Sequence, residues 1–167
     1  MIDWKSTFLK NLLEILYDPN QPRDERGRWV STGGGRSFID AAIKSDGFSY
    51  QPITKMSPNS GVMVSLDSKE GFEKSVKLPD DPVERSATVL RTFQDYIKDN
   101  LQVLRNNKNL YVGGWLEGDS FCFDLSENFP SSDMKKVISI AKERKQRGVY
   151  NIDTKEYILE KDYGKYL

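Results

Sequence analysis

The sequence predicts an α+β domain with an antiparallel sheet and two helices on one face of that sheet, in a split βαβ-like order. Two runs of strand-forming residues, 110–116 and 120–126, are separated by a short polar break that contains Gly118, which is typical of a β-hairpin. Long amphipathic helical patterns flank this hairpin over 82–105 and 133–147, and each needs a sheet to cover. The hairpin is therefore the predicted centre of the sheet.

Residues 1–18 form a predicted amphipathic helix ahead of the domain. Trp4, Phe8 and Leu12 recur at helical spacing along one apolar stripe, and the pattern stops before Pro19, because the residue before a proline avoids the helical region. An isolated helix of this length is unstable in water, so the stripe must pack on another surface. That surface is either the chain's own domain or another chain, including a second copy of this protein.

Residues 19–46 are predicted to be an extended arm. Over 19–36 the sequence has two prolines, four glycines and dense charge of both signs, with no hydrophobic period. A short helix is predicted over 37–45. Trp29 stands out in this polar segment, because an exposed tryptophan is typical of an anchor that inserts into a partner. The alternative is a Trp29 side chain folded back on the chain's own domain.

The domain itself is predicted to span residues 47–160. It starts with an irregular or edge segment at 48–59, followed by a strand at 61–67 and a loop over 68–82. After the first helix, the hairpin and the second helix, three further segments are expected. They are a last strand at 149–153, a hairpin partner or tail at 156–159, and a C-terminal tail at 161–167 that is expected to fray.

Both long helices have recognisable ends. Asp81 is placed to cap the first one, with Pro82 at its first helical position. Ser131 and Ser132 offer an N-cap for the second, and Gly148 is its predicted terminating residue. Positive charge suits the exposed carbonyls at a helix C-terminus, which accounts for a basic cluster there: Lys142, Arg144, Lys145 and Arg147.

The composition excludes several classes of function. Lys plus Arg and Asp plus Glu each number 25, so the basic excess that is usual in nucleic-acid-binding proteins is missing, and nucleic acid is not an expected partner. The chain has no histidine, which excludes Ser-His-Asp and Cys-His pairs and histidine metal sites. Its single cysteine, Cys122, excludes an intramolecular disulfide. No metal or other cofactor is expected, and no stretch is apolar enough to predict a membrane span.

The hairpin brings together the residues with the most chemical potential, namely Trp115, Cys122 and Asp124. A buried Asp124 would have a raised pKa, which is a property of many catalytic carboxyl groups. We favour a structural role, in which Asp124 bonds backbone N–H groups or the indole of Trp115. In that interpretation Gly113 and Gly114 let Trp115 pack closely across the sheet.

Two parts of the chain resemble phage sequences. The segment DPNQPRDERGRW at 18–29, followed by a Gly-Gly pair, resembles a segment of tailed-bacteriophage head-morphogenesis and other virion-associated proteins. The GGW at 113–115, FDLS at 123–126, the Lys145-Gln146 pair and YNID at 150–153 resemble a small phage module. That module has a GGW motif, a strand reading YLDVS, a helix with Asn-Gln and a strand reading IYDL. The likeness covers residues 47–157, and Lys145 stands where the module usually has Asn.

The resemblance implies a phage or prophage accessory protein that is not an enzyme. Its expected action is protein–protein binding in head assembly or as a virion component, in the host cytoplasm or the virion. Its expected partners are phage structural proteins, with homo-oligomerisation through the N-terminal helix as a further option. The expected contact residues are Trp4, Phe8, Leu12 and Trp29.

Two alternatives remain open at the level of sequence. The first is a host-directed inhibitor, such as an anti-CRISPR or other anti-defence protein, which would bind a host defence protein. The second is an enzyme that uses the carboxyl group of Asp124.

Overall fold

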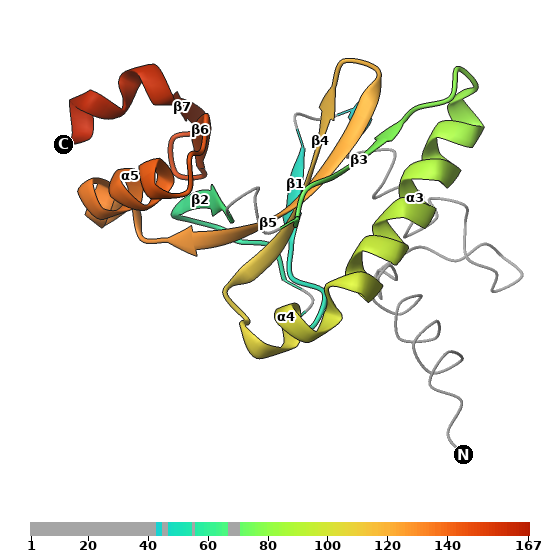
Figure 1. Cartoon of the computed structure of the whole chain (residues 1–167), viewed down its shortest axis with the longest axis horizontal. Helices are drawn as coiled ribbons and strands as arrows, with labels where there is room; N and C mark the ends of the chain where they lie inside the picture. The colour runs from blue at the N-terminus through green and yellow to red at the C-terminus, as the bar shows by residue number, and fades with distance from the viewer. Residues whose placement is uncertain (1–42, 45–46, 55, 67–70) are drawn as a thin grey trace, which may run out of the picture.

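The computed structural model describes residues 43–44, 47–54, 56–66 and 71–167 (Figure 1). The predicted N-terminal helix and most of the predicted arm lie outside the described residues, and so do Trp4, Phe8, Leu12 and Trp29. The described chain has the predicted α+β fold, and its strands belong to one antiparallel sheet.

The sheet has seven described strands in the order β1-β4-β5-β2-β6-β7, with β3 also paired to β5. Every pairing is antiparallel. The strands are β1 (Phe48–Tyr50), β2 (Val62–Ser65), β3 (Lys74–Lys77), β4 (Leu110–Glu117), β5 (Ser120–Phe129), β6 (Gly148–Asn151) and β7 (Glu156–Leu159).

The β4–β5 hairpin is the centre of the sheet, as predicted. Strand β5 pairs with β4 along all eight residues of β4, from Leu110 opposite Glu127 to Glu117 opposite Ser120. Its other edge is shared by two short strands, with β3 beside residues 120–123 and β2 beside residues 126–129. The long β5 therefore joins the two halves of the molecule (Figure 1).

The helices α3 (Pro82–Asp99) and α4 (Leu101–Asn106) pack on the half of the sheet with the β4–β5 hairpin, and α5 (Met134–Glu143) packs on the half with β2 and β6. Phe121, Phe123 and Leu125 of β5 are fully buried in the core cluster that contains α3. Phe129, on the same strand, packs in the cluster that contains α5. Because side chains alternate between the faces of a strand, these odd-numbered residues share one face. The prediction of two helices on one face is confirmed.

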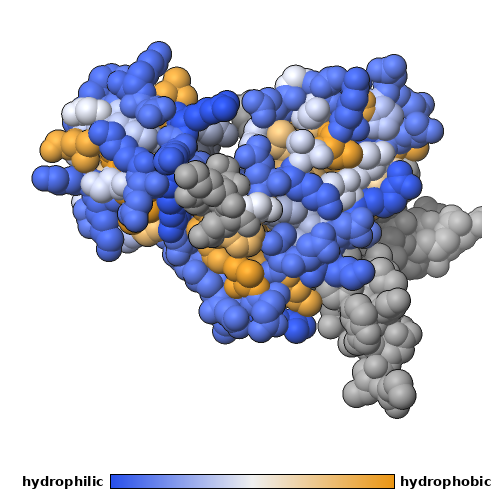
Figure 2. Space-filling model, in the orientation of Figure 1, coloured by the Kyte–Doolittle hydropathy of each residue, from blue (hydrophilic) through white to orange (hydrophobic). Residues whose placement is uncertain are grey.

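Two core clusters lie under these helices. The first joins α3 to the central hairpin through residues such as Phe93 and Ile97, and the second joins α5 to β2, β6 and the C-terminus. Full burial of a Phe or Ile side chain stabilises the fold by about 1.5–3 kcal/mol. An ion pair between Arg144 and Glu127 connects α5 to β5 between the clusters. The face shown in Figure 2 is mostly hydrophilic, with small hydrophobic patches.

The first long helix begins as predicted and is interrupted near its end. The Asp81 carboxylate accepts hydrogen bonds from the backbone N–H groups of Val83 and Glu84, both at 2.9 Å. The single helix predicted to residue 105 is divided at Asn100, where the backbone leaves the helical conformation. The Asn100 side chain donates to the Tyr96 carbonyl at 2.9 Å, so it competes with the helical backbone bonds.

Other boundaries correct the sequence prediction. Strand β3 lies within the predicted 68–82 loop. Its charged residues gave too few apolar positions for a strand to be predicted there. Helix α5 ends through Lys145, whose φ of 55° is left-handed, and the predicted terminator Gly148 instead begins β6. The C-terminal segment expected to fray contains a 3-10 helix (Glu160–Tyr166) that buries Tyr163. Of the helices in the described part of the chain, none is both long and apolar enough to cross a membrane.

Candidate functional site

Asp124 lies on the sheet face opposite the helices and is 8% exposed. Its carboxylate accepts hydrogen bonds from the hydroxyl groups of Ser65 on β2 and of Ser126, the latter at 3.3 Å. The hydrogen-bond partners of Asp124 are therefore hydroxyl groups. The partners predicted from the sequence are backbone N–H groups or the Trp115 indole. They join β2 to β5 next to the point where the partner of β5 changes from β3 to β2.

Burial raises the pKa of Asp124 to about 6, because the two hydroxyl bonds only partly offset the loss of water around the charge, and the negative Glu73 raises it further. Cys122, on the same face, is also buried. Burial and the neighbouring Glu117 raise the pKa of its thiol to about 11, so it is protonated and a poor nucleophile at neutral pH.

The two glycines of the hairpin make room for other groups than Trp115. A Cβ atom at Gly113 would come within 2.2 Å of the Asp124 carboxylate, and one at Gly114 would come within 2.3 Å of the Phe48 ring. Trp115 itself is half-buried opposite Cys122. Asp124 is thus enclosed by the backbone at Gly113 and by two hydroxyl groups, an arrangement that suits a structural carboxyl group.

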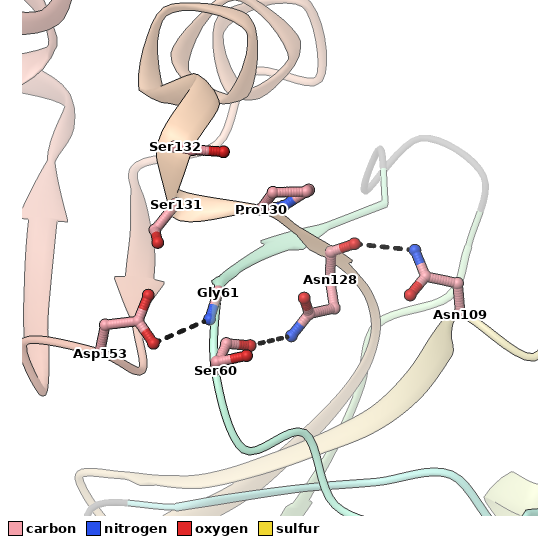
Figure 3. Close-up of a pocket in the computed structure, with 8 residues that line it drawn as sticks. All are labelled: Ser60, Gly61, Asn109, Asn128, Pro130, Ser131, Ser132 and Asp153. Atoms are coloured by element: carbon pink, nitrogen blue, oxygen red, sulfur yellow. Dashed lines mark hydrogen bonds between the residues drawn. The ribbon is translucent and has the colours of Figure 1, made fainter.

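A polar cleft of about 490 Å³ lies at the far end of β5 (Figure 3). Five separate segments meet there: the start of β2, the turn before β4, the end of β5, the start of the α5 region and the β6–β7 turn. We call it the Asp153 cleft, and its lining residues are Ser60, Gly61, Asn109, Asn128, Pro130, Ser131, Ser132 and Asp153.

Hydrogen bonds to the main chain fix both asparagine side chains of the Asp153 cleft. The Asn128 amide nitrogen donates to the Ser60 carbonyl and the Asn109 amide nitrogen donates to the Asn128 carbonyl, each at 2.8 Å (Figure 3). Because these partners are acceptors, they settle which amide atom is nitrogen and which is oxygen. The amide oxygens are therefore the atoms left for other contacts.

Asp153 is also held in place. One of its carboxylate oxygens accepts from the Gly61 N–H at 3.2 Å, and its own N–H donates to the Asn151 side chain at 3.0 Å. Asn151 is 8% exposed, so this turn rests on a buried amide. The neighbouring Ile152 N–H donates to the Gly61 carbonyl at 2.9 Å. Figure 3 shows the second carboxylate oxygen of Asp153 and the Ser131 hydroxyl facing the same space.

Sequence reasoning missed the Asp153 cleft, although two of its features had been noticed. The sequence predicts Ser131 and Ser132 as helix caps, but the cap of α5 is Asp133, whose carboxylate accepts from the Lys136 N–H at 3.3 Å. Residues 150–153 carry part of the phage resemblance. The lining comes from positions 60 to 153, so no local pattern unites it. An available signal was the Asn-x-Asp spacing of Asn151 and Asp153, which is typical of a turn that fixes a side chain.

Comparison with protein-family models, with curated proteins and with solved structures finds no match to this chain. Across the described ranges, no group of three or more Cys, Asp or Glu side chains is arranged to hold a metal ion. The proposal for function therefore rests on the Asp153 cleft and on the phage resemblance.

Proposed function

We propose that this chain is a phage or prophage accessory protein that acts by binding another protein and that it is not an enzyme. The observation that carries the proposal is the Asp153 cleft, an open polar cleft whose side chains are held by main-chain hydrogen bonds. Pre-fixed hydrogen-bonding groups favour recognition, because little side-chain entropy is lost when a partner binds. The phage resemblance supports a role in head assembly or in the virion, and hence a location in the host cytoplasm or the particle.

The chemistry of the described domain fits binding better than catalysis. The Asp153 cleft offers one carboxylate, whereas general acid–base chemistry usually needs a second group of complementary protonation. Asp124 has a raised pKa, but it is enclosed, and its nearest partners are serine hydroxyl groups. The hydroxyl groups bonded to Asp124 are enclosed with it, because Ser126 is 6% exposed and Ser65 is half-buried, so a substrate has little access to them.

The N-terminal residues supply the second part of the proposed contact surface. Trp4, Phe8 and Leu12 are proposed to pack on the partner or on a second copy of the chain. Trp29 is proposed as an anchor for the arm. Tryptophan side chains are typical of the small set of residues that carry most of the binding energy in an interface.

Affinity purification of the full chain from infected cells tests this proposal. We expect phage structural proteins to be recovered and to bind the purified chain directly. Deletion of residues 1–36 is expected to weaken that binding at least tenfold while the domain stays folded. A chain that stays monomeric, recovers no phage protein and can lose residues 1–36 without effect on particle assembly would refute the proposal. Recovery of a host defence protein alone would replace head assembly with the anti-defence alternative.

A further inference from the structure

We infer that the Asp153 cleft receives the side chain of an arginine that the partner protein presents. This inference rests on the proposed function, and it names the chemistry of the partner at that site. It follows from which hydrogen-bonding atoms of the lining are already used, from the charge of the lining, and from the shape of the space they enclose.

The fixed donors of the lining are already occupied. The Asn128 and Asn109 amide nitrogens bind main-chain carbonyls, and the Gly61 N–H binds Asp153. The atoms that remain are the amide oxygens of both asparagines, the second carboxylate oxygen of Asp153 and the serine hydroxyls. Hydroxyl groups can accept as well as donate. The cleft is therefore complementary to a ligand that brings several donors.

The charge of the lining has the same implication. Asp153 is charged, while the other seven lining residues are neutral. The lining thus carries a negative charge without a positive group of its own, which favours a cationic ligand. Asp153 is exposed and keeps its main-chain bond to Gly61 through one oxygen, so the other oxygen can bind a cation without any rearrangement.

A guanidinium group fits this set of acceptors better than an ammonium group. Arginine offers five N–H donors in a rigid plane, which can reach a carboxylate oxygen, an amide oxygen and a hydroxyl from one position. The Asp153 oxygen and the Ser131 hydroxyl face one space above Gly61, and the Asn128 amide oxygen lies beside Gly61, where a Cβ atom would come within 2.5 Å of it (Figure 3). A cleft of about 490 Å³ also has room for the backbone that carries the arginine.

A titration followed by nuclear magnetic resonance tests the inference with the full chain. The probe is the capped tripeptide acetyl-Gly-Arg-Gly-amide, and the control is the same peptide with citrulline, which has the shape of arginine without its charge. We expect saturable shifts of the Asn109 and Asn128 side-chain amide signals and of the Gly61 backbone signal, with a dissociation constant on the order of 1 mM. The citrulline peptide is expected to bind at least tenfold more weakly.

Two variants separate the cleft from general charge effects. Asp153→Asn removes the negative charge and can keep the hydrogen bond to Gly61. It is expected to weaken binding of the arginine peptide about tenfold. Glu156→Gln makes the same change in charge on the neighbouring β7 strand, outside the cleft, and is expected to leave the affinity unchanged. Equal binding of the citrulline peptide or of acetyl-Gly-Lys-Gly-amide, absence of saturable shifts at the cleft, or equal effects of the two variants would overturn the inference.

Failure of this inference is distinguishable from failure of the proposed function. If a phage protein binds the chain and Asp153→Asn leaves that affinity unchanged, the arginine assignment fails and the binding function stands. If no partner is recovered, the proposed function fails, while the peptide titration still decides the chemistry of the cleft.

Discussion

Asp124 and Asp153 lie in two different polar sites and use their carboxyl groups in opposite ways. Asp124 is in the middle of the central strand, is 8% exposed, and bonds two serine hydroxyls. Asp153 is exposed in a turn, bonds one backbone N–H group and keeps its second oxygen directed into an open cleft. A carboxyl group in a strand full of apolar residues attracts attention in the sequence, yet the exposed one in the turn is the one placed to meet a partner.

The difference shows that a raised pKa alone does not mark a functional carboxyl group. Burial raises the pKa of Asp124, and the same burial removes access to it. The hydrogen bond from Gly61 uses one carboxylate oxygen of Asp153 and leaves the other oxygen free to accept from a partner. The proposed recognition depends on this second oxygen.

The largest expected effects come from adding a methyl group beside each site. Gly61→Ala is expected to cost more than about 3 kcal/mol of unfolding free energy, because its φ is +93° and the new Cβ would meet the Phe129 carbonyl at 2.5 Å. Gly113→Ala should cost about 2 kcal/mol, because the Cβ would meet the more adjustable Asp124 carboxylate.

Urea unfolding measures both values. Gly164→Ala is the control, because a Cβ there has no heavy atom within 4 Å, and it should change the unfolding free energy by less than about 0.5 kcal/mol. If Gly113→Ala is as mild as Gly164→Ala, Asp124 does not occupy the space that we assign to it.

Asp124→Asn is expected to stabilise the fold at neutral pH. The folded-state pKa of about 6 lies above the ordinary aspartate pKa of 3.8, so the protonated group favours the folded state. The contribution of Asp124 to stability is therefore highest below pH 4, falls as the pH rises toward 6 and is constant above that range. Removing the charge should add about 3 kcal/mol at pH 8 and nothing near pH 3.5.

Urea unfolding of the wild type and of Asp124→Asn across pH 3.5–8 checks this expectation. A variant that is less stable than the wild type at pH 8 would mean that the ionised carboxylate stabilises the fold. That result would contradict the raised pKa of Asp124.

Lys145 provides a smaller test, at the end of the helix whose start lines the Asp153 cleft. Its left-handed φ of 55° favours glycine or asparagine, so Lys145→Gly should stabilise the fold by about 1 kcal/mol. Lys142→Gly, inside the last turn of α5, should instead destabilise it by about 1 kcal/mol. Thermal unfolding distinguishes the two signs, and destabilisation by Lys145→Gly would contradict the left-handed assignment.

The smallest expected effect on stability belongs to Asp153→Asn. The residue is exposed and the amide oxygen can keep the bond to Gly61, so the unfolding free energy should change by less than about 0.5 kcal/mol. Urea unfolding at pH 7 provides the measurement. A loss above about 1.5 kcal/mol would show that Asp153 serves mainly to hold the turn.

The sequence was sufficient for features that depend on local patterns. The hairpin, the Asp81 cap and the helical stripes on either side follow from residue spacing, and the structure has all of them. Lys145 has left-handed backbone, which asparagine, the residue expected at this position from the phage resemblance, adopts more readily than lysine.

Features that depend on contacts between residues far apart in the chain could not be predicted from the sequence. Gln51 is fully buried in a segment predicted to be irregular or at a sheet edge, and its amide donates to the carbonyl of Leu110, 59 residues away, at 2.9 Å. Strand β3 forms on charged residues because β5 has a free edge there. The Asp153 cleft likewise exists because the sheet brings five segments together.

The central claim is that Asp153 recognises a partner, whereas Asp124, which is enclosed in the sheet, does not contact one. The most direct test is the titration of acetyl-Gly-Arg-Gly-amide into the Asp124→Asn and Asp153→Asn variants, followed through the side-chain amide signal of Asn128. The account predicts wild-type affinity for Asp124→Asn and about tenfold weaker binding for Asp153→Asn. Weaker binding by Asp124→Asn together with unchanged binding by Asp153→Asn would contradict it.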